Sequence, residues 1–230
     1  MIDSELAALA PIWYVVFLLS ITCHEAAHAW AAEVGGDPTA ALAGQVSLNP
    51  IPHVRREPFG TILVPMLSLI FAGWMIGWAS APFNPYWQQR HPHRAAWMAL
   101  AGPAANLVLV ILAGMAIHIG IAMGYFAVPE FVQFTKLVDA PSGGVAEGLA
   151  RFLSLLFSQN ILLMAFNLLP VPPLDGSAAI GLLVSEKIAL KINDFMRQPG
   201  FSFIGMLIAW NLFGSIFGPL FRMAVRLLYL

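Results

Sequence analysis

Long apolar runs separated by short polar stretches dominate the chain. Five runs approach the roughly 20 residues that an α-helix needs to cross a bilayer, and they cover Pro11–Ala32, Phe59–Ala79, Ala95–Met123, Phe152–Leu169 and Phe201–Phe221. A shorter helix is expected near Ser177–Lys191, where the sequence ends in charged residues; it either continues the fourth run beyond a proline break or lies at the membrane interface. The pattern predicts an all-α polytopic membrane protein with about five to six transmembrane helices.

The second run is less regular than the others. Phe59–Ala79 is interrupted by glycines and a proline, and it follows the turn-rich stretch Gly44–His53. Irregular backbone is tolerated at membrane depth only where protein or a wet cavity supplies hydrogen-bond partners. We therefore expect a re-entrant or hairpin segment between the first run and the run that starts at Ala95, with a strand or loop at Gly44–Pro52 beside a cavity or at the surface.

The basic residues favour re-entry of the second run over a full crossing. If the first run passes inward, with Asp3 and Glu5 outside, and the second run returns to the inner side, most basic residues lie inside: Arg55, Arg56, Arg90, Arg94, Lys187, Lys191 and Arg197. This distribution follows the positive-inside rule, whereas a crossing at Phe59–Ala79 would scatter the basic residues over both faces. The expected location is the plasma (inner) membrane.

Composition agrees with a membrane protein. Hydrophobic residues make up 59% of the chain and charged residues only 10%, against about 25% charged residues in soluble domains. The net charge of −1 argues against a nucleic-acid partner, and the single cysteine excludes an internal disulfide framework. Met1–Ala10 has no basic residue and does not resemble a cleaved signal peptide. Without a polar linker or a repeat, residues 1–230 are expected to form a single membrane domain.

The first run contains an H-E-x-x-H motif, His24-Glu25-Ala26-Ala27-His28. Histidines four residues apart on a helix lie about 40° apart around its axis, so both imidazoles can bind one metal ion while Glu25 faces a water on that metal. The alternative is that the motif is a chance match without function, at the solvated end of a helix. Ionisable groups inside a membrane are costly and usually functional, which favours a metal site.

A catalytic zinc site needs a third protein ligand, and Asp175 is the best candidate. It is the only acidic residue between Arg151 and Glu186, and the prolines before it interrupt the helix so that its side chain can point into a cavity. The same carboxylate could instead cap the helix that begins near Gly176. The residues alone leave both roles open.

Two asparagines in apolar runs, Asn106 and Asn167, have two possible roles each. A buried amide can join neighbouring helices, or it can bind substrate backbone and stabilise an oxyanion beside the metal. Small residues around Gly102 would let another helix approach the first of these amides closely. In the orientation above, both asparagines, the H-E-x-x-H motif and Asp175 lie toward the inner half of the membrane. His53 could line the cavity entrance or bind the metal in a resting state, although solvation at the surface is the favoured interpretation.

Taken together, these motifs resemble the site-2 proteases, a family of intramembrane zinc metalloproteases. The resemblance covers about Leu19 to Leu183 in the family's order, and rests on His24-Glu25-x-x-His28, Gly44–His53 with Leu48-Asn49-Pro50, Gly102-Pro103-x-x-Asn106, and Asn167 through Asp175-Gly176. It implies that His24, His28 and Asp175 hold one Zn²⁺ and that Glu25 is the catalytic acid and base. It further implies that Asn106 and Asn167 position substrate or stabilise an oxyanion, and that Gly44–His53 forms a membrane-associated hairpin.

The resemblance implies a zinc endopeptidase that hydrolyses peptide bonds in or near transmembrane segments of membrane proteins, with its active site toward the cytoplasmic side. The expected partners are a transmembrane protein or peptide substrate and membrane lipid; the sequence does not determine the substrate or the oligomeric state. There is no insertion large enough for a PDZ domain, and Ser80-Ala81-Pro82 stands where relatives often place a basic residue before proline. The alternatives are a metal transporter or sensor that uses the same ligands, and an inactive scaffold for transmembrane helices.

Overall fold

The structure is a computed structural model that describes residues 4–198 and 200–230. Its regular secondary structure is helical, apart from isolated β-bridges in the loop between α6 and α7. The helices are α1 (Ser4–Val34), α2 (Thr39–Leu42), α3 (Pro50–Arg56), α4 (Val64–Ala72, preceded by a π-helical turn at Phe59–Leu63), α5 (Pro85–Arg90), α6 (Pro92–Ala122), α7 (Val145–Asn167), α8 (Asp175–Ala179, continued by a 3-10 turn at Ile180–Leu183), α9 (Glu186–Met196) and α10 (Phe201–Leu228). Asp3, which the predicted orientation places outside, lies beyond the described residues.

Four helices in the described part of the chain are long and apolar enough to cross a membrane: α1, α6, α7 and α10. This agrees with the predicted all-α membrane fold, although the count is lower than the expected five to six. The second apolar run, for which re-entry was favoured over a crossing, forms a helix of only 14 residues, five in the π-helical turn and nine in α4. Such a helix is at most about 21 Å long, whereas the hydrocarbon core is about 30 Å thick.

After α4 the chain turns back and runs beside the π-helical turn that precedes this helix. Gly73 ends the helix in a left-handed conformation with φ of 75°, and the returning residue Trp78 donates its backbone N–H to the Gly60 carbonyl at 3.1 Å. A Cβ on Gly77 would lie 2.2 Å from that same carbonyl oxygen. The glycines that interrupt the second run therefore allow two backbone segments to touch, and residues 77–84 then run extended toward α5.

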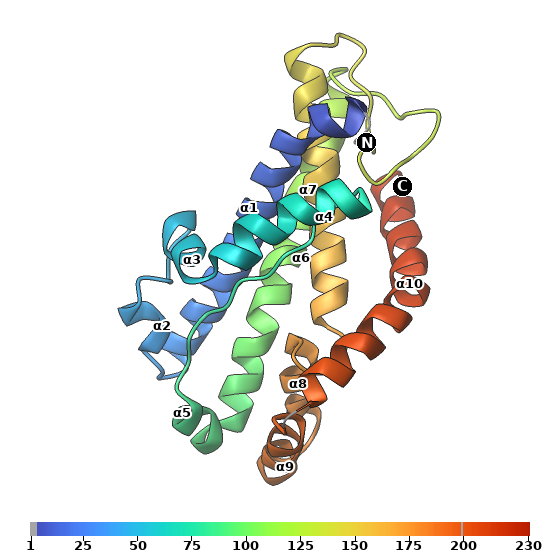
Figure 1. Ribbon diagram of the computed structural model, residues 1–230. Helices are drawn as coiled ribbons and strands as arrows, with labels where there is room; N and C mark the ends of the chain where they lie inside the picture. Colours follow the sequence, from blue (N-terminus) through green and yellow to red (C-terminus); the bar gives the residue numbers. More distant parts are fainter. Residues whose placement is uncertain (1–3, 199) are drawn as a thin grey trace.

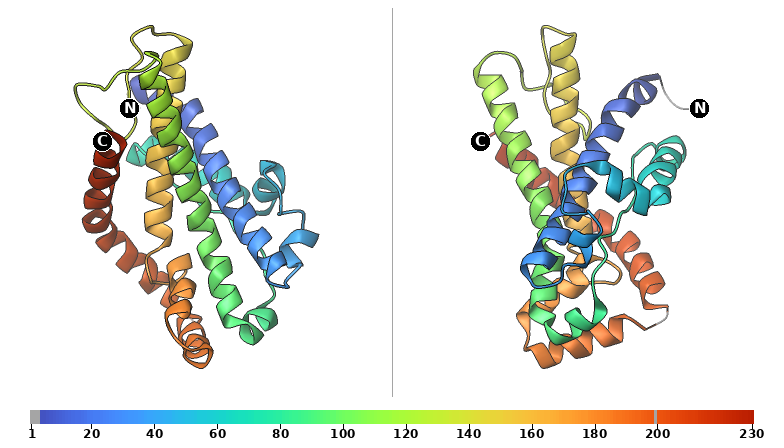
Figure 2. Two further views of the ribbon diagram at one scale, coloured as in Figure 1. Left: turned by 180° about the vertical axis from the view of Figure 1, so that it is seen from behind. Right: turned by 90° about the vertical axis from the view of Figure 1, so that its left-hand side faces the viewer.

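The core lies where α1, α6 and α7 pack side by side, as Figures 1 and 2 show. Fully buried apolar side chains from all three helices meet there, among them Phe17, Ile117, Leu155 and Ile161. α10 bends around the outside of this bundle (Figure 1) and packs aromatic rings against it. Both termini lie at one end of the molecule, and α5, α8 and α9 lie at the other (Figure 1).

The hairpin expected at Gly44–His53 does not form. The described residues there make a loop, which follows α2, and the first turn of α3, with no strand. The physical reason is the Asn49-Pro50 pair: the Asn49 side chain accepts a hydrogen bond from the Ile51 N–H at 3.0 Å, and Pro50 occupies the first helical position. Asparagine at the N-cap followed by proline is a helix start, so this stretch begins a helix instead of joining two strands.

The helix expected at Ser177–Lys191 is also different in the structure. It is divided into α8 with its 3-10 turn and a separate helix, α9, that begins at Glu186. The chain is extended at Val184 and at Ser185, which is the N-cap of α9. Two extended residues cannot continue a helix, so the chain is interrupted between the 3-10 turn and α9.

Candidate metal centre

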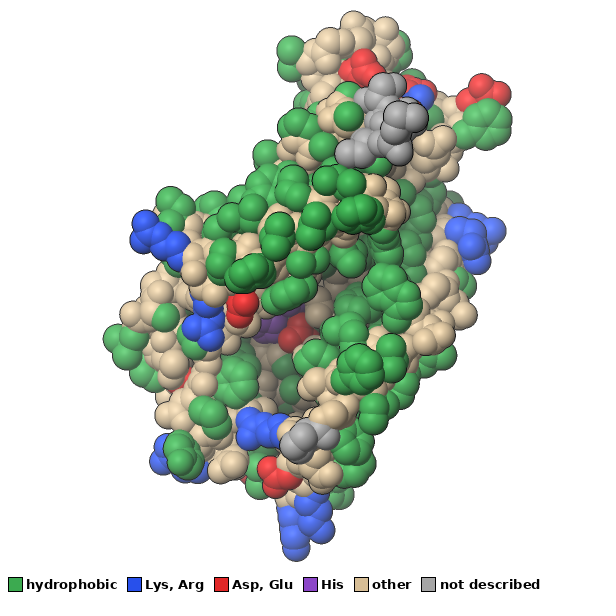
Figure 3. Space-filling view, viewed as in Figure 1, with side chains coloured by type: hydrophobic (Ala, Val, Ile, Leu, Met, Phe, Trp, Pro, Cys, Tyr) green, Lys and Arg blue, Asp and Glu red, His purple; other side chains and the backbone are tan. Residues whose placement is uncertain are grey.

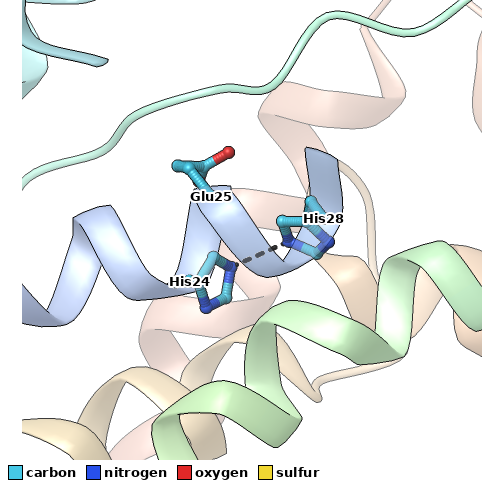
Figure 4. A group of neighbouring side chains, drawn as sticks. All are labelled: His24, Glu25 and His28. Carbon is cyan, nitrogen blue, oxygen red and sulfur yellow. Dashed lines mark hydrogen bonds between the residues drawn. The ribbon is translucent and has the colours of Figure 1, made fainter. Parts of the chain in front are cut away.

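His24 and His28 lie one turn apart on α1, and both rings face α6 (Figure 4). Both side chains are buried within the bundle. Their Nε2 atoms are 3.0 Å apart. Asp175, the first residue of α8, brings its Oδ2 to 3.1 Å from His24 Nε2 and 3.3 Å from His28 Nε2. Three donor atoms therefore form a small triangle, and the aspartate that completes it lies about 150 positions after the two histidines in the chain.

Hydrogen bonds on the other side of each ring set which nitrogen carries the proton. His28 Nδ1 lies 2.7 Å from the Met98 carbonyl, which can only accept, so Nδ1 donates. His24 Nδ1 donates in the same way to Asn106 Oδ1 at 2.6 Å. In the neutral rings both Nε2 atoms therefore present lone pairs to each other and to the carboxylate. Three electron-rich atoms this close together repel one another unless a cation lies among them.

The donor set and its spacing fit zinc. Bonds of about 2.0–2.1 Å from zinc to nitrogen and oxygen in tetrahedral geometry place neighbouring donors about 3.3 Å apart. Asp175 Oδ2 is buried and makes no hydrogen bond in the described part of the chain, as expected for an atom directed at a metal. Helix capping by this carboxylate is not observed, because α8 begins without a side-chain cap.

Gly102 on α6 leaves the space beside the two imidazoles open. A Cβ at this position would lie 2.3 Å from His28 Nε2 and 2.5 Å from His24 Nε2. The expectation that small residues here allow close helix approach is confirmed, and the approach is to the two histidines themselves. Any larger residue would occupy the space that both lone pairs face.

Glu25 is buried and points away from α6, toward the extended segment that precedes α5 (Figure 4). Its carboxylate and the two histidines have ligand atoms within 4.8 Å of one another. Together with His28 and Asp175 it lines a cavity of about 460 Å³. The other walls are residues 79–83, the start of α6, the Pro172–Ala178 segment, and the junction of α9 with α10. Figure 3 shows histidine and acidic side chains at the bottom of a hollow below α4.

The two predicted amides occupy different places. Asn106 is fully buried and bonded to His24, and its Nδ2 donates to Asn160 Oδ1 at 2.7 Å. It therefore orients a histidine and has no free donor for substrate. Asn167 lies in the last turn of α7, half-buried, does not line the cavity, and makes no side-chain hydrogen bond within the described residues. The structure does not bring it to the metal centre.

Sequence reasoning missed three further buried polar residues, of which Ser20 and Asn160 connect to the site through Asn106. Ser20, Gln159 and Asn160 are all fully buried, and the only signal in the sequence was their polarity inside apolar runs. His53, favoured as a surface residue, is also buried, with Nε2 3.0 Å from the Ser47 carbonyl. It does not line the cavity, so neither role suggested for it near the metal is supported.

Comparison with known proteins agrees with this geometry. The model of peptidase family M50 matches residues 12–211, most of the chain. The chain belongs to peptidase family M50. This is the site-2 protease family of zinc metalloproteases, so the chain is classed as a hydrolase and the resemblance seen in the motifs is confirmed.

Individual relatives support the assignment. The candidate zinc metalloprotease YwhC of Bacillus subtilis is 32% identical over 202 residues, which are 87% of this chain and 80% of YwhC. Rip2 of Mycobacterium tuberculosis, also named as a candidate zinc metalloprotease, is 30% identical over 166 residues, and the match covers 71% of this chain and 54% of Rip2. The chain thus spans only about half of the length of Rip2. No solved structure matches the chain.

Proposed function

We propose that this family M50 member is an intramembrane endopeptidase that cleaves peptide bonds in or near transmembrane segments. The observation that carries the proposal is the triangle of donor atoms from His24, His28 and Asp175, 3.0–3.3 Å on a side, at the base of a cavity among membrane-length helices. One Zn²⁺ held by these three residues would lower the pKa of water and polarise a scissile carbonyl. Membership of a hydrolase family argues against the alternative of a metal transporter.

Glu25 is the residue that handles protons in this proposal. Its carboxylate lines the cavity on the face of α1 next to the histidines. A carboxylate oxygen in that position can accept a proton from the attacking water and deliver it to the leaving amine nitrogen. His24 and His28 would not share this task, because each Nδ1 donates a hydrogen bond and each Nε2 lone pair would bind the metal.

The extended segment 79–83 is the best-placed partner for a substrate backbone. Ala79, Ser80, Ala81 and Phe83 line the cavity, and within the described residues the backbone groups of residues 79–81 make no hydrogen bonds. A transmembrane helix must unwind before its amides can be cleaved, and an extended neighbour with free N–H and C=O groups can pair with it. Gly44–Asn49 forms a loop and does not line the cavity, so residues 79–83 are the better-placed partner.

The orientation proposed for the chain places the cavity toward the cytoplasmic side of the plasma (inner) membrane. Both α5 and α9, which carry Arg90, Lys187 and Lys191, lie at the end of the molecule away from the termini (Figure 1). Basic residues on one face of a membrane protein favour the cytoplasm. In this orientation the re-entrant helix Phe59–Ala72 enters the membrane and returns on the cytoplasmic side.

The test is Glu25→Gln with Glu33→Gln as the matched control, since Glu33 is an exposed residue on the same helix. General acid and base groups contribute about 10²–10⁴-fold, so Glu25→Gln should keep its zinc and lose nearly all cleavage. The measurements are zinc content of purified protein and comparative membrane proteomics, in which uncleaved substrate accumulates with Glu25→Gln but not with Glu33→Gln. Equal substrate processing by Glu25→Gln and wild type would contradict the proposal.

A further inference from the structure

A chain of buried amides and hydroxyls extends behind His24, away from the cavity. It joins α1, α6 and α7 through His24, Asn106, Asn160 and Ser20. The two asparagines and Ser20 are fully buried. Buried polar groups are costly in a membrane protein unless every one is satisfied, so the direction of each hydrogen bond in this chain carries information.

Backbone carbonyls set the direction of each hydrogen bond in this chain of side chains, because a carbonyl can only accept. Ser20 Oγ donates to the Val16 carbonyl at 2.7 Å, so the same oxygen is left to accept from Asn160 Nδ2 at 2.9 Å. Asn160 Nδ2 also donates to the Leu156 carbonyl at 2.7 Å. Both of its N–H groups are thereby used, and the Asn160 amide cannot turn over without facing acceptor to acceptor.

The fixed amide of Asn160 determines the next one. Its Oδ1 accepts from Asn106 Nδ2 at 2.7 Å, and the second N–H of Asn106 is directed at the Ser20 carbonyl at 3.4 Å. Asn106 must therefore present Oδ1, and not Nδ2, to the ring of His24. If the Asn106 amide were reversed, its N–H would face His24 Nδ1 and move the ring proton to Nε2, where it would block metal binding.

We infer that Asn160 is a positioning residue that selects the metal-binding tautomer of His24, acting through Asn106. The inference rests on the proposed zinc site, whose ligand His24 it explains. Asn160 does not line the cavity, and it touches neither the carboxylates nor His28. Its effect is therefore on the protonation pattern of one imidazole, in the way that groups behind a metal ligand set its orientation and basicity.

The neighbouring residue Gln159 offers a matched control. It is equally buried on the same helix, but its amide bonds to the Trp13 indole N–H at 3.0 Å and to the Met75 carbonyl at 3.3 Å. That pair is separate from the chain that ends at His24. Asn160→Leu and Gln159→Leu each remove one buried amide together with its hydrogen bonds to buried groups, so their general effects on stability should be similar.

The experiment measures zinc affinity by competition with a chelator in detergent-purified full chain, and the ring-nitrogen NMR shifts of ¹⁵N-histidine-labelled protein without metal. We expect Asn160→Leu to weaken zinc binding by about 10–100-fold and to place part of the His24 population in the Nε2–H tautomer. Gln159→Leu should change neither. Asn160→Asp, which keeps the acceptor toward Asn106, should retain the wild-type tautomer even where stability falls.

Two results would overturn the inference: wild-type tautomer and zinc affinity in Asn160→Leu, or equal losses in Asn160→Leu and Gln159→Leu. Failure of the proposed function would look different: the wild-type chain itself would bind no zinc or cleave no substrate. The NMR readout still decides the role of Asn160 in that case, since it is made on metal-free protein.

Discussion

Gly102 shows how strongly one residue can be constrained at the candidate metal centre. Its missing side chain leaves room beside two Nε2 atoms, 2.3 and 2.5 Å from where a Cβ would lie. Neither ring can move aside freely, because His24 is held by Asn106 and His28 by the Met98 carbonyl. The glycine is retained in the middle of a long helix despite a cost of about 0.5–1 kcal/mol relative to alanine.

We predict that Gly102→Ala lowers zinc affinity at least about 10-fold, as for other losses of ligand orientation. The control is Gly114→Ala on the same helix, where the new Cβ would make ordinary contacts at 3.5 Å with Leu228 and Phe157. Gly114→Ala should bind zinc like wild type and unfold at an equal or higher temperature. Chelator competition and thermal unfolding measure both effects, and wild-type zinc binding by Gly102→Ala would contradict the assigned site.

At the scale of elements, one buried carboxylate in the loop after α1 holds the start of α5. Asp37 accepts from the Asn84 N–H at 2.6 Å and from the Thr39 N–H at 3.0 Å. Burial opposes the charged form, but the hydrogen bonds from Thr39 and Asn84 outweigh it and hold the pKa of Asp37 below its ordinary value. The extended segment 79–83 is thus anchored at the end where it leaves the cavity.

Replacing this carboxylate should destabilise the protein in a pH-dependent way. Because the native pKa lies below the unfolded value of about 3.9, Asp37 stabilises the fold above that pH and loses its effect as the pH falls through the native pKa. We expect Asp37→Asn to unfold at a lower temperature than wild type at pH 7, with a difference that narrows below about pH 4. The exposed Asp194→Asn is the control, and metal-free protein avoids any contribution from zinc release. A difference independent of pH would contradict the role of the charge.

At the scale of the whole molecule, a short apolar helix lies among four of membrane length. Phe59–Ala72 is too short to cross, and the chain returns along its start through the contact of Trp78 with Gly60. In the proposed orientation, α3 and α5 therefore face the same side of the membrane.

Cysteine labelling tests this arrangement. In a chain whose only native cysteine, Cys23, is replaced by serine, the exposed positions Arg55→Cys and Arg90→Cys should react with an impermeant thiol reagent from the cytoplasmic side. Val145→Cys, 92% exposed at the start of α7, should react only from the opposite side. Reaction of Arg55→Cys and Arg90→Cys from opposite faces would show that Phe59–Ala79 crosses the membrane.

The sequence by itself determined the features that repeat along a helix or fall within one short motif. Apolar runs located α1, α6, α7 and α10, with five of their eight ends within three residues and the other three off by seven, because the bilayer imposes length and composition directly. The spacing of His24 and His28 predicted a shared metal, since one helical turn places both on one face. Glycines in the second run and the acid at Asp175 were also visible, although residues alone left their roles open.

Only the tertiary structure decided which side chains from different helices meet. It brought Asp175 to the two histidines, placed Asn106 behind His24 and left Asn167 away from the site. Asn160 lies 54 positions after Asn106, and its polarity inside an apolar run did not indicate which residue it would contact. The rotation and depth of one helix against another arise from packing across the whole bundle, so a residue's distant partners cannot be read from its neighbours in the chain. The hydrogen bonds that orient His24, and the direction of each, form only when α1, α6 and α7 pack together.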